Sequence, residues 1–321
     1  MRLSPSKSGF PFRGLSVVAM KEAADHMSSM RVHLVMLLVV LAGLAAIFGS
    51  IGQIKATIGE DDFLLLRLFT IAKAPLPSFA AFLGFLLPLI SIALAFDAIN
   101  GEYNRRTMSR LLAQPIFRDA VLAGKFLGSL MVLTICLLTL WLLMTGLGIL
   151  TLGVPPSGEE VLRGIAYLLC CIAYGAVWLA VAMLFSTLLR SPATSALAAL
   201  TLWLVFTVFW PMIAPTIANL LAPVDPFSPA SIIANAEWQA VAQRLSPNVL
   251  YNEMTLALLS PETRSLGLVF FEQLSGAVPG APLPFGQSSL LVWPHFAGLF
   301  ATVILVFTLA YVSFQRQEVR N

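Results

Sequence analysis

The sequence predicts an all-α, polytopic membrane protein with six transmembrane helices. Three observations carry this prediction. Of its 321 residues, 58% are hydrophobic and only 11% are charged, whereas a soluble domain carries about a quarter charged residues. Several uncharged runs reach about twenty residues, the length that crosses a bilayer. Lipid offers the backbone no hydrogen-bond partners, so these runs are expected to be helices, and the alternation of a β-barrel is absent.

The six spans are predicted at about 32–54, 76–96, 126–152, 164–189, 193–222 and 290–314. The first run is too long for a signal-peptide core and follows a long polar stretch, so we expect a retained anchor. In the turn LLRSPATS, Arg190 marks the polar side and Pro192 is expected to start the fifth span. The span interiors contain essentially no ionisable residue, which argues against a self-powered, ion-driven transporter.

Residues 1–31 are predicted to form an N-terminal segment with an amphipathic helix at the membrane surface. Within residues 15–31, apolar side chains recur at helical spacing, while Lys21, Glu22 and Asp25 fall on other faces. The apolar set is Leu15, Val18, Ala19, Ala23, Met27 and Met30. The alternative is that this segment only supplies positive charge that fixes the topology.

Both termini are predicted to lie in the cytoplasm, because this orientation places thirteen of the nineteen lysines and arginines there. They are Arg2, Lys7, Arg13, Lys21, Arg31, Arg105, Arg106, Arg110, Arg118, Lys125, Arg190, Arg316 and Arg320. The loop 223–289 then lies outside, and residues 290–321 form the last span with a short cytoplasmic tail.

The loop 223–289 is predicted to be a folded, helical cap. SIIANAEWQAVAQRL indicates one helix. SPNVLYNEMTLALLS indicates a second, with Ser246 as its cap and Pro247 at its first position. Loops of this length are usually functional or disordered, and the apolar spacing favours a folded one.

The segment 97–125 is too polar for lipid and too apolar for a plain linker. Leu111, Leu112, Ile116 and Phe117 alternate with Arg105, Arg106, Arg110 and Arg118. This mixture suits a short surface helix held by another protein. Asp97 and Glu102 are expected to pair with Arg105 or Arg106 rather than to perform acid–base catalysis.

Signatures of catalysis or metal binding are missing from the sequence. Three scattered histidines and the span residues Cys136, Cys170 and Cys171 make no metal pattern, so the cysteines are expected to be packing residues. HExxH, GxSxG and GxxxxGK[ST] are absent, so the chain is expected to bind neither a metal nor ATP. Small residues of spans one and three (Gly43, Ala46, Gly49, Gly146 and Gly148) allow close helix contacts, including a homodimer seam.

The segment 97–125 resembles the first cytoplasmic loop of type 2 ABC transporter permeases. Its matching residues are Glu102, Thr107, Met108, Leu111, Leu112, Pro115, Arg118, Gly124 and Lys125. Two departures concern the helix start and the partner contacts: Arg106 replaces the usual glycine, and Ala113–Gln114 replaces a serine-containing pair. Lys21–Glu22 followed by MSSMR is similar to the family's interfacial helix, and the large outer loop resembles the NosY-like branch, associated with multi-copper enzyme maturation.

This resemblance implies the permease subunit of an ABC exporter in a bacterial-type cytoplasmic membrane. The loop would be a coupling helix seated on a separate ATPase, which holds ATP and Mg. A second permease copy and membrane lipid are the other implied partners, and no nucleic acid is. The implied coupling residues are Glu102, Arg105, Arg106, Thr107, Leu111, Leu112, Pro115, Ile116, Phe117, Arg118 and Lys125; those of the interfacial helix are Lys21, Glu22, Met27 and Met30. The alternatives are an ATPase-driven scaffold or mechanotransmitter that transports nothing, and a membrane-embedded enzyme.

Overall fold

The computed structural model describes residues 12–56, 63–72, 77–108, 113, 117–266 and 282–316, with the backbone alone at residues 12, 13, 50, 53, 55 and 56. Within these ranges every regular element is a helix, and six helical stretches are long and apolar enough to cross a membrane. The predicted all-α polytopic class is therefore confirmed. Residues 109–112 and 114–116 of the predicted coupling segment lie outside the described residues.

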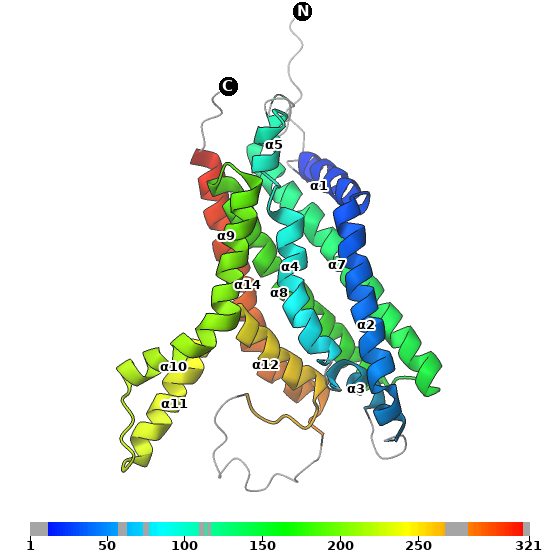
Figure 1. The fold of residues 1–321 in the computed structure, drawn as a ribbon, viewed down its shortest axis with the longest axis vertical. Coiled ribbons are helices and arrows are strands. Elements are labelled where there is room, and N and C mark those ends of the chain that lie inside the picture. The colour runs from blue at the N-terminus through cyan, green and yellow to red at the C-terminus, as the bar shows by residue number, and fades with distance from the viewer. Residues whose placement is uncertain are drawn as a thin grey trace, which may run out of the picture.

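The six long stretches form an upright bundle (Figure 1). They are built on α2 (Met30–Ala56), on α4 (Phe79–Ala95) with the continuation of that stretch to Asn104, on α7 (Arg118–Leu152), on α8 (Gly158–Leu188), on the series α9 (Pro192–Leu204), η1 (Val205–Phe209) and α10 (Trp210–Leu221), and on α14 (Phe285–Arg316). The shorter helices are α1 (Phe12–Met27), α3 (Leu64–Thr70), α5 (Asn100–Asn104), α11 (Pro229–Gln243) and α12 (Pro247–Leu259). The end of the bundle with α1, α5 and the last turn of α14 is called the α1 end, and the opposite end the α12 end (Figure 1).

Helix α8 is the central helix of the bundle and packs against α4, α7, α9, α12 and α14. Its Tyr167, Tyr174 and Trp178 are at most 2% exposed. Lipid tails are as apolar as leucine, so burial among helices gives little hydrophobic gain, and close packing with hydrogen bonds stabilises the bundle instead. Gly175 shows such packing, because a Cβ there would lie 2.6 Å from Leu133 Cδ2.

The fifth span, predicted as one helix over 193–222, is three consecutive helices with a π-helical segment in the middle. Pro192 starts α9, as predicted. In η1 the N–H of Trp210 reaches the carbonyl of Val205, five residues back. The next such donor would be residue 211, which is a proline without an N–H. The carbonyl of Phe206 accepts a hydrogen bond from Ser246 Oγ instead, at 3.1 Å. The interruption of the α-helix at η1 therefore has an identifiable cause, as breaks in long helices usually do.

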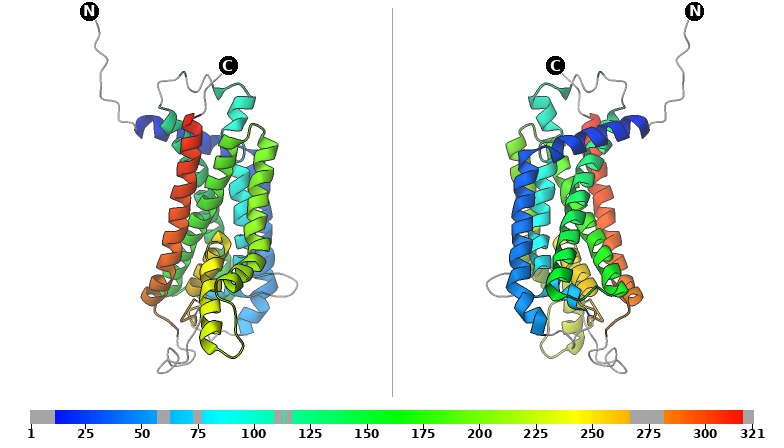
Figure 2. Two further views of the ribbon diagram at one scale, coloured as in Figure 1. Left: turned by 90° about the vertical axis from the view of Figure 1, so that its left-hand side faces the viewer. Right: turned by 90° about the vertical axis from the view of Figure 1, so that its right-hand side faces the viewer.

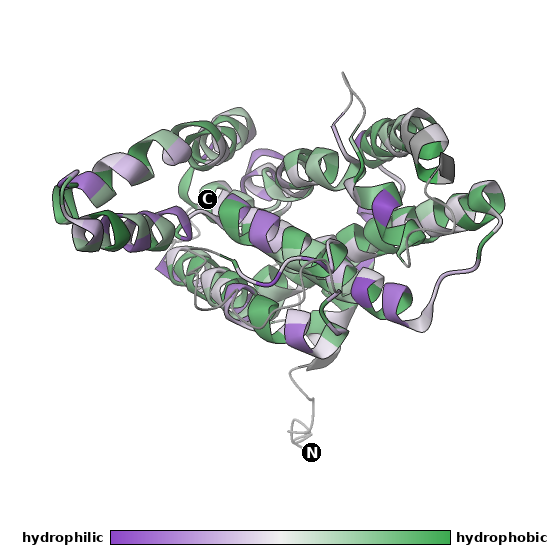
Figure 3. Cartoon of the chain, turned by 90° about the horizontal axis from the view of Figure 1, so that it is seen from below, coloured by the Kyte–Doolittle hydropathy of each residue, from purple (hydrophilic) through white to green (hydrophobic). Residues whose placement is uncertain are grey.

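Helices α10 and α11 form a hairpin that projects sideways from the bundle (Figure 3). Asn235 Nδ2 donates to Asn219 Oδ1 and to the carbonyl of Ala222, both at 2.8 Å. Trp210 Nε1 donates to the carbonyl of Ala242 at 2.9 Å. The Trp210 bond lies at the base of the hairpin, where α10 begins and α11 ends, and the Asn235 bonds lie toward its tip.

Both helices predicted within the loop 223–289 are present, as α11 and α12. Ser246 does precede α12, and Pro247 is at its start, but the prediction that Ser246 caps the helix is wrong. Its side chain makes no cap hydrogen bond, and its hydroxyl donates to the carbonyl of Phe206.

The close helix contacts predicted for small residues are present at Gly43 and Gly148. A Cβ on Gly43 would meet Met144 Sδ at 3.0 Å, and one on Gly148 would collide with Leu68 of α3. Both glycines therefore pack within this chain. Helix α3 itself, a seven-residue buried helix between the first two spans, has no counterpart in the sequence prediction.

Candidate coupling site at the α1 end

Helix α5 ends in a turn that normally needs glycine. The N–H of Thr107 binds the carbonyl of Glu102 and the N–H of Arg106 binds that of Tyr103, both at 3.0 Å. This is the hydrogen-bond pattern of a Schellman motif, in which the residue after the cap is left-handed. Arg106 occupies that position with φ of 57°, a conformation that favours glycine. The backbone geometry therefore explains why the family resemblance expects a glycine at this position. Arg106 adopts the same left-handed conformation at a cost in conformational energy.

The same turn points the Glu102 carboxylate into the protein. Thr107 Oγ1 donates a hydrogen bond to that carboxylate and also lies 3.2 Å from the Glu102 carbonyl oxygen. Lys125 Nζ then lies 3.1 Å from Glu102 Oε1. The prediction that Glu102 pairs with Arg105 or Arg106 is wrong, because its partner is a lysine one helix further along the chain.

Lys125 also binds Glu22 of α1, with Nζ at 3.1 Å from Oε1 and 2.9 Å from Oε2. The Lys125 side chain is 4% exposed and that of Glu22 is 11% exposed. An isolated buried ammonium would be very costly, and two carboxylates offset that cost. Lys125 therefore joins α1, α5 and α7 in one buried cluster, which we call the Lys125 cluster (Glu22, Glu102, Thr107 and Lys125).

Helix α1 reaches Lys125 because α7 carries two glycines one turn apart. A Cβ on Gly124 would lie 2.7 Å from Val18 Cβ, and one on Gly128 would lie 2.7 Å from the carbonyl of Ala19. Real side chains do not approach so closely, so only glycine permits this crossing, as in other small-xxx-small contacts. Figure 2 shows α1 lying across the α1 end of the bundle.

A hydrogen bond from the last turn of α1 extends this contact. His26 Nε2 lies 3.1 Å from Ser129 Oγ, on α7 next to Gly128. Burial lowers the pKa of His26, which favours the neutral imidazole. On the exposed side, the hydrogen bond to Asp25 raises the pKa of Lys21. The two faces of α1 thus differ, one closing on α7 and the other carrying solvent-exposed charge.

The α1 end of α4 is fixed to α8 and α2. Ser186 Oγ accepts hydrogen bonds from the backbone N–H of Ile99 and Asn100, at 3.0 and 3.3 Å. Asn100 Nδ2 donates to the carbonyl of Leu189 at 3.1 Å and so closes the end of α8. Asp97, also predicted to pair with Arg105 or Arg106, instead binds Arg31 Nη1 of α2 at 2.9 Å.

The remaining described coupling residues face outward or toward α14. Arg105, Arg106 and Phe117 are exposed, and Phe117 is 70% exposed. The Arg118 guanidinium lies 5.4 Å from the centre of the Phe314 ring, a cation–π contact with the end of α14. The predicted coupling residues Leu111, Leu112, Pro115 and Ile116 lie outside the described residues, so their role stays a prediction.

Comparison with known proteins decides which family this arrangement belongs to. The family model described as "ABC-2 family transporter protein" matches residues 16–319, almost the whole chain. The chain is a member of the ABC-2 transporter family. It is thereby a transmembrane subunit of an ABC transporter, and membership implies an ABC ATPase as partner.

Two relatives place this ABC-2 permease near one branch of the family. The "Probable ABC transporter permease protein NosY" of Stutzerimonas stutzeri is 27% identical over 255 residues, which cover 78% of this chain and 82% of the relative. The protein of the same name from Pseudomonas aeruginosa is 34% identical over 144 residues, covering 44% of this chain and 52% of the relative. The resemblance to NosY-like type 2 permeases is confirmed.

The interfacial helix of this ABC-2 permease differs from its prediction in two ways. Glu22 is not on the polar face but inside the contact with α7, beside the buried Val18, Ala19 and Ala23. Met30 begins α2 rather than continuing α1. At the break, the Ser28 hydroxyl lies 3.0 and 3.1 Å from the carbonyl oxygens of Ala24 and Asp25, a side-chain contact that competes with continuation of the helix. Met27 and Met30 are exposed.

At the α12 end, the permease has a second charged cluster that the sequence prediction missed. Helix α8 begins at Gly158, not at 164, so Arg163 lies in the second turn of this helix rather than before the span. Arg163 is fully buried and donates to Glu159 Oε1, to the carbonyl of Leu258 at 3.1 Å and to Ser288 Oγ at 3.1 Å. It therefore joins α8 to the end of α12 and to α14.

The neighbouring Glu160 serves two helix starts at once. Its Oε2 accepts from the N–H of Ser157 at 2.7 Å, while Ser157 Oγ accepts from the N–H of Glu160, a capping box. Its Oε1 accepts from the N–H of Leu65 at 2.7 Å, at the start of α3. The pattern S-x-x-E at Ser157–Glu160 was the sequence signal that would have placed the start of α8 correctly.

The residues described by the structure include no group of three His, Cys, Asp or Glu side chains able to hold a metal ion. Cys136, Cys170 and Cys171 are free and buried. Cys171 packs beside Tyr251, whose hydroxyl lies 2.7 Å from that of Tyr167. These contacts join α12 to α8.

Proposed function

We propose that this permease works as an exporter driven by a separate ATPase that docks on the segment 97–125 at the cytoplasmic side. The observation that carries the proposal is the Lys125 cluster. The exposed Arg105, Arg106 and Phe117 lie on or beside the segment that would meet the ATPase. Directly behind them, Glu102 and Lys125 connect α5 to α1 and α7. A displacement of this segment by the ATPase would thus be transmitted to both α1 and α7.

The chain would contribute no catalysis of its own, and ATP with Mg would be held by the partner. Two copies of the permease and two ATPases would make the transporter. The NosY name of its relatives supports a role in maturation of a copper enzyme, as a further part of this proposal.

The docking site is tested by replacing Leu111 and Leu112 with Asp. The double variant is expected to insert in the membrane normally but to lose its ATPase on co-purification, because apolar anchors carry most of the energy of such contacts. Leu245→Asp, at a leucine that is 66% exposed on the other side of the protein, is the matched control and should keep the ATPase. Normal co-purification of the Leu111/Leu112 variant would refute the docking site.

The orientation is tested with single cysteines. A cysteine at Gln243 is expected to react with an impermeant thiol reagent added outside intact cells, and one at Gln114 is expected to react only after the membrane is opened. The native cysteines are buried and give a low background. The reverse labelling pattern would place both termini outside.

Mechanical transmission without transport is the second candidate. The observation that favours it is the joining of α3, α12 and α14 to the first turns of α8 by Glu160 and Arg163, so that movement of α8 would reach the whole α12 end. Reconstituted vesicles distinguish the two functions. ATP-dependent movement of a solute identifies an exporter, and ATPase stimulation without such movement identifies a transmitter.

A further inference from the structure

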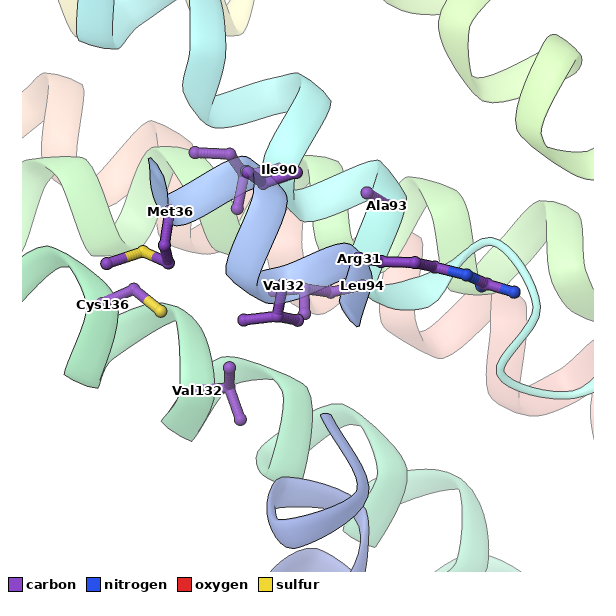
Figure 4. Close-up of a pocket in the computed structure, with 9 residues that line it drawn as sticks. Arg31, Val32, Met36, Ile90, Ala93, Leu94, Val132 and Cys136 are labelled. Atoms are coloured by element: carbon purple, nitrogen blue, oxygen red, sulfur yellow. The ribbon is translucent and has the colours of Figure 1, made fainter. Parts of the chain in front are cut away.

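An apolar crevice opens between α2, α4 and α7 near the α1 end (Figure 4). It holds about 310 Å³, counted with its open mouth. Eight apolar or weakly polar side chains and one arginine line it: Val32, Val35 and Met36 with Arg31 from α2, Ile90, Ala93 and Leu94 from α4, and Val132 and Cys136 from α7. The crevice belongs to neither charged cluster described above.

Arg31 stands at one end of the crevice. Its guanidinium points away from the sulfur atoms of Met36 and Cys136 (Figure 4). The side chain is 57% exposed, and the guanidinium lies 5.3 Å from the centre of the Phe96 ring. Within the described part of the chain its hydrogen bond goes from Nη1 to Asp97. A guanidinium has five N–H donors in a planar fork that suits phosphate, so several remain for a ligand.

We propose that this crevice binds an anionic phospholipid of the leaflet at the α1 end. One acyl chain would lie along the apolar wall, and the headgroup phosphate would bind Arg31. The layout matches such a molecule, with one cation at the membrane surface and an apolar remainder. Met36 is five positions after Arg31 on α2, so the wall extends about 7.5 Å along the helix from the backbone of Arg31, at a rise of about 1.5 Å per residue. That depth accepts the upper part of an acyl chain.

Asp97 sharpens the proposal, because its carboxylate competes with the phosphate for the same guanidinium. Removing Asp97 should therefore strengthen the binding of an anionic lipid, while removing Arg31 should weaken it. If the Arg31–Asp97 pair only stabilised the fold, both changes would act in the same direction. The proposal does not depend on ATPase docking or on the direction of transport.

Native mass spectrometry of the purified, delipidated full chain tests the site. Phosphatidylglycerol and phosphatidylcholine with identical acyl chains are titrated in separate experiments. The wild type is expected to retain phosphatidylglycerol more strongly. Arg31→Gln should weaken that retention about tenfold, the usual effect of one charge-assisted hydrogen bond. Arg316→Gln, at an exposed arginine on the end of α14, should leave it unchanged.

Two further variants separate the headgroup contact from the acyl-chain contact. Asp97→Asn should increase retention of phosphatidylglycerol and leave phosphatidylcholine unaffected. Ala93→Phe fills the crevice and should lower retention of both lipids. Equal losses in Arg31→Gln and Arg316→Gln, reduced phosphatidylglycerol retention in Asp97→Asn, or unchanged retention in Ala93→Phe would each overturn the proposal.

Discussion

Lys125 of α7 and Glu22 of α1 form a buried ion pair, with Nζ 2.9 Å from Oε2, although 103 residues separate them in the sequence. The pair forms where Gly124 and Gly128 let the two helices touch. Glu102 completes it from the side of the predicted ATPase contact. This one contact thus connects the N-terminal helix, the third span and the coupling segment.

Lys125→Met should destabilise the permease strongly. The substitution leaves the carboxylates of Glu22 and Glu102 buried side by side, and removing one partner of a buried pair costs about 3–5 kcal/mol. Thermal unfolding in detergent measures the loss. Lys21→Met removes a lysine whose side chain is 56% exposed, and should cost at most about 1 kcal/mol. Adding Glu22→Gln to Lys125→Met should recover part of the lost stability, because one unpaired carboxylate is removed.

Gly128→Val should separate α1 from α7. The new Cβ would lie 2.7 Å from a backbone carbonyl of α1, which has no flexible end to move aside. A cysteine introduced at Ala23, which is 8% exposed, should then become reactive toward thiol reagents. Gly146→Val is the matched control on the same helix, since a Cβ there meets nothing within 4 Å. Equal protection of the cysteine in both backgrounds would show that the glycines are not required.

Arg106→Gly should stabilise the turn after α5. Its φ of 57° costs an L-residue about 1 kcal/mol, and glycine avoids that cost. Arg105→Gly is the control with the opposite expected sign, because Arg105 has an ordinary φ of −80° and glycine there only adds freedom to the unfolded chain. Melting temperatures of the two variants provide the comparison. If both fell, the left-handed turn would not hold in solution.

Acid should loosen the contact between α1 and α7. Burial lowers the pKa of His26 below the ordinary 6.5, so the unfolded state takes up a proton first. The stabilising contribution is complete above pH 6.5 and is lost as the pH falls below that value toward the folded pKa. The lowering of the His26 pKa is opposed by the negative charges of Glu22, Asp25 and Asp97 and is supported by the positive charge of Lys125. The melting temperature should fall below pH 6.5 in the wild type and less steeply in His26→Gln.

Local rules predicted the elements that depend on neighbouring residues. Pro192 and Pro247 start helices where the sequence indicated, because proline at the first turn is a local preference. Helix α3 was missed because seven residues make no span, and its start is capped by Glu160, which is 95 residues from Leu65. Such a contact has no signature in the neighbouring sequence.

The charged clusters were harder to predict than the helices. Glu102 has two arginines within four residues, and the structure instead pairs it with a lysine 23 residues away. Nearness in the sequence was misleading, because the Schellman turn points the arginines outward and the carboxylate inward. The GxxxG spacing at Gly124–Gly128 was visible in the sequence, but its partner helix was not.

The long separation between His26 and Ser129, 103 residues, has a consequence for synthesis. At roughly 5–20 residues per second, a ribosome needs on the order of five to twenty seconds to progress from α1 to the part of α7 that receives it. During that interval the newborn α1 has no docking groove, and Glu22 has no counter-ion from α7. The N-terminal helix must therefore remain undocked, and the closing of its buried ion pair marks the moment when the third span is in place.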